Sequence, residues 1–413
     1  MTAAFIHDDF LLGSKTARRL FHEHAAGLPI IDYHGHLDPR ELAEDRAFAS
    51  ITRAWVAPDP YKHRAMRIAG VPERFITGPV APREAFDRWA ATVPLTVGNP
   101  LFHWTALELK RYFDIDELLC PATADRVWQV CNRRLRDPDC SARGLIGRPG
   151  VECVCTSDRL LDDLAAHEAL ARTEFGTRVL PSLRADDVVG VDLPGYRAWL
   201  DALGTATATV VNSYEAFQDA VSRRLDAFDR LGCRLSDHAL DDFIYIPGAE
   251  SETASLFARH LSGRTLAGAE VVRLRSGILR FLGLEAGRRG WIMQLHIGAQ
   301  RHTSTRLRAL AGPAGGYAAI GTPCDIPSLC RFLDDLETGG RLPRTILYPL
   351  NPSDHAALAV LTGSFVEDGV RGKVQLGPAW WYNDHRMGIR RQLDDLAAHG
   401  LLSTFVGMTT DSR

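Results

Sequence analysis

The sequence carries a histidine pair whose spacing suits a metal ion. His34 and His36 stand two residues apart at the end of a short apolar segment, residues 29–34. Side chains alternate across a strand, so both imidazoles are expected to project from one face. A bare pair of this kind is equally compatible with two hydrogen-bonded structural histidines. Functional residues of α/β barrels cluster where strands end, and this position favours a metal site.

Polar residues also end several other apolar segments: Arg184, Asp237, His296 and Asp411. Any one of them alone is more simply explained as a cap or an ion-paired residue. Their coincidence at strand ends predicts one shared site. Asp411 is the expected anionic partner of the two histidines. Two imidazoles and a carboxylate suit one divalent ion of borderline character, for which we expect zinc, and they leave positions open for substrate oxygens.

Arginine and tryptophan residues near the same ends indicate the substrate chemistry. Arg184, Arg301 and Arg413 are planar forks that pair bidentately with carboxylate or phosphate, so an anionic substrate is expected. The sequence has no G-x-x-x-x-G-K-[ST] loop, and a nucleotide is not favoured. Trp380 and Trp381 offer flat walls for the C–H faces of a sugar, although simple core packing would also explain them.

Short apolar segments that alternate with helical stretches must position these side chains. Eight such segments predict a closed (β/α)₈ TIM barrel. Amphipathic patterns predict helices over residues 214–231 and 385–399. The predicted strands are residues 29–34, 151–156, 178–184, 233–238, 291–298, 345–350, 374–380 and 404–411.

The long interval between the first two predicted strands indicates an insertion. Residues 38–150 are rich in aromatic residues and arginine, and residues 86–93 and 104–113 have helical periodicity. We expect a mainly helical insertion on the catalytic face. No repeat, low-complexity tract or clear linker interrupts the chain, so residues 1–413 are expected to form a single barrel domain.

Composition limits the partners and the compartment. The 413 residues include 48 Lys and Arg against 51 Asp and Glu, without long blocks of one sign, which argues against nucleic acid and membrane surfaces as partners. Eight scattered cysteines form no C-x-x-C pair and are typical of a reducing compartment. No signal peptide or membrane span is apparent, so a cytoplasmic protein is expected. Self-association into a homo-oligomer is left open.

Several sequence blocks, taken in order, resemble one known family from Asp9 to the last residue. They are residues 32–37, 61–67, 90–104, 180–181, 232–238, 293–301, 350–352, 380–381 and 405–413. The chain resembles the uronate isomerases (glucuronate isomerases), a divergent branch of the amidohydrolase superfamily. The resemblance implies an amidohydrolase-like barrel and an aldose–ketose isomerase acting on D-glucuronate and D-fructuronate, and on D-galacturonate and D-tagaturonate.

The resemblance also assigns residues by position. It implies that His34, His36 and Asp411 hold the metal, with His296 close by. It further implies that the substrate pocket is lined by Tyr61, Arg184, Asp237, Arg301, Trp380 and Arg413.

Aldose–ketose exchange needs a proton removed from C2 and one delivered to C1 through an enediol. Tyr61, with a pKa lowered by arginine and metal, is the candidate for proton transfer at C2. Arg413 would stabilise the enediolate or help to deliver the proton at C1. Asp411 could act on a substrate hydroxyl and assist ring opening. The metal is expected to chelate the carboxylate and adjacent hydroxyl of the sugar rather than to activate a hydrolytic water.

Two features depart from the family pattern. Pro60 stands where the family usually has histidine, which removes one expected substrate contact. Relatives also continue for several dozen residues beyond the motif that ends at Arg413, so we expect this sequence to be incomplete at its C-terminus.

Two alternative functions are compatible with parts of this pattern. A metal-dependent hydrolase is the commoner activity among barrels with an H-x-H strand, but those enzymes often add a lysine on strand four and a histidine on strand six. Here the corresponding segments end in Asp237-His238 and in Leu350-Asn351-Pro352. A non-catalytic sugar-acid binding protein is the second alternative, motivated by Pro60. The assembled set His34, His36, Tyr61, Asp411 and Arg413 favours isomerisation over both.

Overall fold

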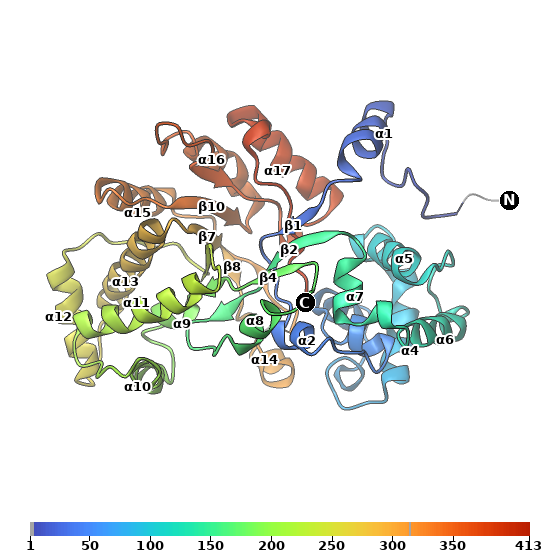
Figure 1. The fold of residues 1–413 in the computed structure, drawn as a ribbon, viewed down its shortest axis with the longest axis horizontal. Helices are drawn as coiled ribbons and strands as arrows, with labels where there is room; N and C mark the ends of the chain where they lie inside the picture. The colour runs from blue at the N-terminus through green and yellow to red at the C-terminus, as the bar shows by residue number, and fades with distance from the viewer. Residues whose placement is uncertain (1–3, 314) are drawn as a thin grey trace.

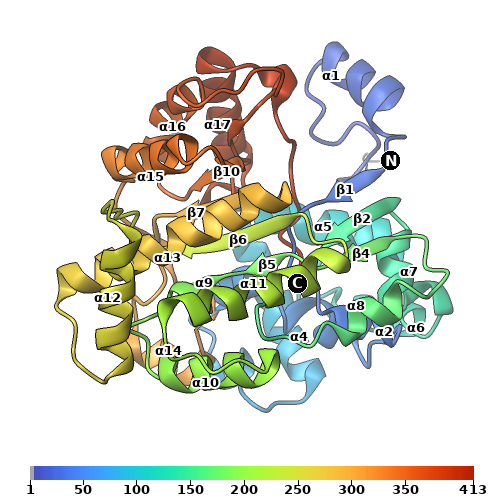
Figure 2. The ribbon, with the colours of Figure 1, turned by 60° about the vertical axis from the view of Figure 1, so that its left-hand side comes forward.

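A parallel sheet wrapped by helices is the centre of the fold (Figures 1 and 2). The computed structural model describes residues 4–313 and 315–413. Seven of the eight predicted strands form. They are β1 (Ile30–Asp32), β2 (Val151–Cys155), β4 (Arg178–Leu180), β6 (Leu235–Leu240), β7 (Ile292–Ile297), β10 (Arg344–Pro349) and β11 (Val374–Leu376).

Two strands resume after short interruptions, and their continuations link the two hydrogen-bonded groups of parallel strands. β3 (Asp158–Arg159) continues β2, and β5 (Leu183–Arg184) continues β4. The hydrogen-bonded orders are β1-β2-β4 and β3-β5-β6-β7-β10-β11, with parallel pairing throughout both. All carboxyl ends therefore meet at one edge, as the predicted α/β class requires.

Side-chain alternation in β7 separates the two faces of the sheet. Met293, Leu295 and Ile297 pack outward against residues of the surrounding helices. His296 and its neighbour in register, Tyr348 of β10, point inward with their rings stacked at a centroid distance of 4.4 Å. The period of two thus directs both polar residues of this strand, Gln294 and His296, to the inner face.

Helices between successive strands cover the outer face (Figure 2). The predicted helices over 214–231 and 385–399 are confirmed as α11 (Tyr214–Arg230) and α17 (Arg386–His399). No helix in the described part of the chain is both long and apolar enough to cross a bilayer. The other covering helices are α8 (Ala165–Leu170), α9 (Asp186–Val189), α10 (Tyr196–Thr207), α12 (Glu250–Leu261), α13 (Gly268–Arg289), α15 (Ile326–Thr338) and α16 (His355–Leu361).

The segment between β1 and β2 is helical and lies to one side of the sheet (Figure 1). It has its own buried cluster, in which Phe86 and Trp89 of one helix are fully buried with Met66 and Leu109 of two others. This cluster gives the segment a rigid base beside the site. Its helices are α2 (Pro39–Ala43), α3 (Pro60–Ile68), α4 (Pro82–Thr92), α5 (Pro100–Phe113), α6 (Ala124–Arg134) and α7 (Ala142–Gly147).

The predicted strand over residues 404–411 does not form, so a closed eight-stranded barrel is not confirmed. Leu402–Thr404 make a short 3₁₀ helix, and residues 405–413 run beside β1 without regular structure. Gly407 and Asp411 have φ angles of 90° and 51°, which interrupt an extended backbone. The Asp32 carboxylate accepts hydrogen bonds from the backbone N–H of Thr410 and from the Thr409 hydroxyl. Side-chain bonds thus replace part of a strand ladder here.

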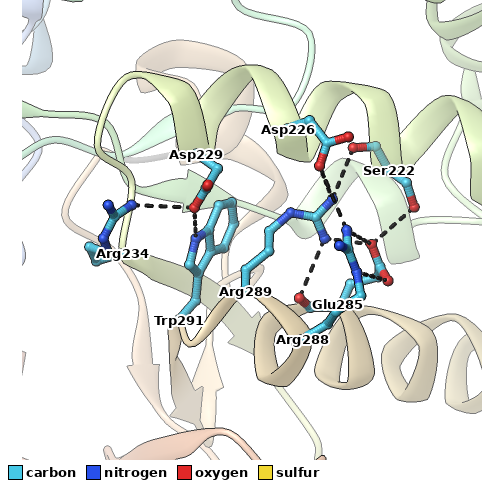
Figure 3. A network of polar contacts seen from close by, with 8 residues as sticks. All are labelled: Ser222, Asp226, Asp229, Arg234, Glu285, Arg288, Arg289 and Trp291. Carbon is cyan, nitrogen blue, oxygen red and sulfur yellow. Dashed lines mark hydrogen bonds and ion pairs between the residues drawn. The ribbon is translucent and has the colours of Figure 1, made fainter.

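An ionic network ties α11 to α13 near the start of β6 and β7, away from the strand ends that carry the polar residues (Figure 3). Arg289 is only 4% exposed and pairs with Glu285 and Asp226. Arg288 pairs with the same Glu285 but is 44% exposed. Trp291 donates its indole N–H to Asp229, which also pairs with Arg234. Burial makes Arg289 the member whose loss leaves uncompensated charge.

We expect Arg289→Met to lower the free energy of unfolding by about 2–4 kcal/mol, because the half-buried Glu285 loses its most buried partner. Chemical denaturation followed by circular dichroism measures this effect. Arg288→Met is the matched control and should cost less than about 1 kcal/mol, since exposed ion pairs contribute little. Equal losses in the two variants would contradict this ranking.

Candidate active site

A cavity of about 270 Å³ opens at the carboxyl ends of the strands. All ten residues that the sequence predicted for the site line it: His34, His36, Tyr61, Arg184, Asp237, His296, Arg301, Trp380, Asp411 and Arg413. They come from segments far apart in the chain. Their convergence places three imidazoles, two carboxylates and three guanidinium groups around one small volume.

His34, His36 and Asp411 form the innermost cluster. The Asp411 Oδ1 atom lies 3.0 Å from His36 Nε2 and 3.7 Å from His34 Nε2. The C-terminal segment is held there by two backbone bonds: the N–H of Asp411 donates to the His34 carbonyl, and the N–H of His36 donates to the Ser412 carbonyl. The carboxylate thus reaches the histidines without a regular final strand.

The donor set of this cluster fits a divalent cation. Asp411 Oδ1 is buried and accepts no well-formed hydrogen bond from the described residues, although two imidazole nitrogens face it. Burial lowers the pKa of His34 to about 4, so its ring is neutral near pH 7. Burial opposes ionisation of Asp411, but His36 and His34 outweigh it and lower the pKa of Asp411 to about 2. Neutral imidazoles and an ionised carboxylate are the forms that bind metal.

A second trio, His34, Asp237 and His296, also lies within ligand distance of one point. Here a hydrogen bond explains the geometry, because His296 Nδ1 lies 2.7 Å from Asp237 Oδ1. Burial opposes ionisation of Asp237, but His296 holds the pKa of this carboxyl well below its usual range. In the neutral tautomer that donates from Nδ1 to Asp237, the His296 Nε2 atom is an acceptor.

Two residues of the cavity wall have backbones in the left-handed region. Asp411 has φ 51° and Trp381 has φ 46°. Aspartate tolerates this region, whereas a tryptophan there is a genuine outlier. Such conformations persist only where surrounding contacts impose them, and they are concentrated at functional sites. Trp380 beside them is 7% exposed, and its indole N–H has no hydrogen-bond partner among the described residues.

Tyr61 enters the cavity from the first turn of α3. Asp59 caps this helix by accepting the N–H groups of Tyr61 and Lys62, and Pro60 occupies the first helical position, where its missing donor costs nothing. Lys62 is 3% exposed and pairs with Asp59. The residue that departs from the family pattern, Pro60, therefore suits the start of the helix and itself lines the cavity.

The protein groups around Tyr61 do not by themselves produce the expected lowering of its pKa. Burial, together with the charges of Asp411 and Asp384, raises the pKa of Tyr61 well above its usual value, and the opposing effect of Arg413 is smaller. The sequence placed Asp411 at the same site but did not show the burial of the phenol or the nearby charge of Asp384. Tyr61 is consequently a protonated hydroxyl that can donate.

The cavity arginines differ in how they are held. Arg184 Nε donates to Asp186 at 2.8 Å. Arg301 pairs with Asp241, and its guanidinium lies over the Trp381 ring at 5.5 Å. Arg184 and Arg301 are thus each held by a carboxylate, and both also line the cavity, where they are available to an anion.

Sequence reasoning missed four polar residues that line the cavity: Arg64, Arg159, His302 and Tyr382. Arg64 lies three residues after Tyr61 on one helix, and this spacing places both on one face. Arg159 was not predicted because the second strand was expected to end at residue 156. That strand instead resumes as β3, where Arg159 is in register with Arg184. His302 and Tyr382 adjoin residues that were named, but no periodicity marks them.

Known proteins match this chain over its whole length. The family model for glucuronate isomerase matches residues 1–413. The uronate isomerase of Bacillus licheniformis is 43% identical over 409 residues, which cover 99% of this chain and 86% of the relative. That of Serratia proteamaculans is 44% identical over 413 residues, which cover 100% of this chain and 88% of the relative.

Solved structures agree. The uronate isomerase of Thermotoga maritima superposes with a TM-score of 0.93 at 29% identity, over 100% of this chain and 89% of that one. The glucuronate isomerase of Caulobacter crescentus has a TM-score of 0.91 at 24% identity, over 99% and 86% of the two chains, and supports the fold. The full-length family match, together with relatives above 40% identity, shows that this chain belongs to the glucuronate isomerase family.

Proposed function

We propose that this protein interconverts D-glucuronate and D-fructuronate, and by the same chemistry D-galacturonate and D-tagaturonate. The observation that carries the proposal is the meeting of His34, His36 and Asp411 in a cavity ringed by guanidinium groups. An anionic sugar meets both features, since its carboxylate suits the arginines and its oxygens suit a cation. Family membership does not favour the alternative of a hydrolase.

His34, His36 and Asp411 are the proposed metal ligands. Their nitrogen and oxygen donors favour zinc among divalent ions. When bound, such an ion supplies Lewis-acid stabilisation of negative charge on the substrate's oxygens. Arg184, Arg301 and Arg413 are proposed to orient the substrate anion, and the free indole N–H of Trp380 is proposed to donate to one of its oxygens.

Proton transfer is proposed to use one group that carries a proton and one group that can accept a proton. Tyr61 holds its proton, so it can deliver one to C2 of the enediolate formed from the ketose, or to a substrate oxygen. His296 is oriented by Asp237 through Nδ1, and its Nε2 can accept a proton. Arg413 lies at the same cavity and would stabilise the enediolate, while Asp411 could accept a hydrogen bond from a substrate hydroxyl during ring opening.

Turnover assays with D-glucuronate and D-galacturonate, together with metal analysis of the same preparation, test the proposed function. We expect conversion of each aldose to its ketose, and incorporation of solvent deuterium at the transferred position. Hydrolysis of lactones or amides without isomerisation would refute the proposal. Binding of a uronate without turnover in the metal-loaded protein would favour a non-catalytic role.

We expect His36→Ala to weaken metal binding by at least about 100-fold, because a direct ligand is removed. Metal content after gel filtration, measured by inductively coupled plasma mass spectrometry, tests this expectation. His302→Ala is the matched control, since His302 lines the cavity outside the metal-binding trio, and it should keep its metal. Full metal content in His36→Ala, with native circular dichroism, would show that the cluster does not bind the ion.

We expect Tyr61→Phe to lower kcat by about 10²–10⁴-fold, because a proton donor is lost from the cavity, with metal content unchanged. Steady-state kinetics and deuterium incorporation from solvent measure the loss. The remaining phenyl ring keeps the edge-on contact of Tyr61 with Trp104, at a centroid distance of 6.0 Å, so stability should be retained. Turnover within about twofold of the unmodified protein would remove this role.

A further inference from the structure

Arg64 joins the helical insertion to two other segments at the mouth of the cavity. It lies on α3, one turn after Tyr61, and lines the same cavity. Its Nη1 group donates to the carbonyls of Gly316 and Ala318 at 3.5 and 3.0 Å, and to the Tyr382 hydroxyl at 3.3 Å. One guanidinium thus connects α3, the chain before β9 (Ala319–Ile320) and the segment after β11.

Tyr382 strengthens the same junction. The Arg64 guanidinium lies over the Tyr382 ring at 4.7 Å, and the Tyr382 hydroxyl donates to the Ala318 carbonyl at 2.6 Å. The Ala318 carbonyl therefore accepts from both residues. A charged donor, a phenol and a cation–π contact together fix this one peptide group more firmly than a single neutral bond would.

The backbones approach each other closely here. Gly316 has φ 76°, and a Cβ atom at this position would lie 2.1 Å from the Pro60 carbonyl oxygen. Arg67, one turn after Arg64, contacts the Gly315 carbonyl and pairs with Glu73. The insertion and the chain leading into β9 are thus in direct contact beside the proposed proton donor.

Ala318 lies across a hairpin from Arg301. β8 (Ala299–Gln300) pairs antiparallel with β9, and Gln300 is opposite Ala319. One step further along the same register places Arg301 opposite Ala318. The Thr303 hydroxyl donates to the Tyr317 carbonyl, so the two segments stay together beyond the last hydrogen-bonded pair of the strands. A group that fixes Ala318 consequently fixes the backbone that carries Arg301.

We propose that Arg64 is a positioning residue for Arg301. By anchoring Ala318 and Tyr382, it sets where the Arg301 guanidinium stands over Trp381 and hence where the substrate anion is held. This inference rests on the proposed function of Arg301 as a substrate contact. It gives a role to Arg64, which belongs neither to the strand ends nor to the metal-binding cluster.

A double-mutant cycle tests the proposal. Arg64→Met should raise KM for D-glucuronate by about tenfold with metal content unchanged, because Arg301 loses its fixed place. Arg301→Met should also raise KM. If Arg64 acts through Arg301, the double variant should resemble Arg301→Met alone. Effects on KM that multiply would show that Arg64 acts independently, and would overturn the proposal.

Hydrogen exchange gives a readout that does not depend on uronate turnover. Arg64→Met should increase exchange in peptides covering residues 299–303 and 317–320, and Arg64→Lys should restore part of the protection. Arg74→Met is the matched control: Arg74 also belongs to the insertion and stacks on an aromatic ring, Phe75, but does not line the cavity, so exchange and KM should stay unchanged. Unchanged exchange in Arg64→Met would contradict the proposal. Failure of the unmodified protein to isomerise uronates would instead contradict the proposed function, with the exchange result still standing.

Discussion

The proposed site depends on one contact: the Asp411 carboxylate meeting the imidazoles of His34 and His36. The two ends of the chain supply these groups, and side-chain and backbone bonds to β1 hold them together in place of a regular strand. A buried carboxylate oxygen without a good hydrogen-bond donor is costly on its own. A cation resolves that cost, and the same cation would give a sugar acid a place to bind.

The electrostatic environments of the cavity residues then suit them to different roles. Burial keeps His34 neutral and Tyr61 protonated, while neighbouring imidazoles keep Asp411 and Asp237 ionised. Groups whose environments push their pKa values apart are those that can serve as ligand, acid and base within one site. The arginines add positive potential around this set and are themselves oriented by acidic partners, such as Asp186 for Arg184.

The sequence predicted the parts of this structure that periodicity and chain order control. Seven strands and the helices α11 and α17 followed from hydrophobic periodicity. Most of the ten site residues followed from polar side chains at or near strand ends, whereas Tyr61 was implied only by the family resemblance. Prediction from the sequence failed where local backbone conformation and contacts between distant segments determine the structure. The strand over residues 404–411 is replaced by bonds to the Asp32 side chain. The pKa of Tyr61 is raised mainly by burial and further by Asp411 and Asp384, which are remote in sequence. The contacts of Arg64 appear only when α3 and β9 are placed together.

The most direct measurement is the anomalous difference map of a crystal of the active, zinc-loaded protein. We expect one strong peak about 2.0–2.3 Å from nitrogen atoms of His34 and His36 and from a carboxylate oxygen of Asp411. We also expect a soaked uronate to place oxygen atoms in the remaining coordination positions of that ion. A protein that isomerises uronates with its metal bound elsewhere, or with the Asp411 carboxylate turned away from both histidines, would refute this metal site.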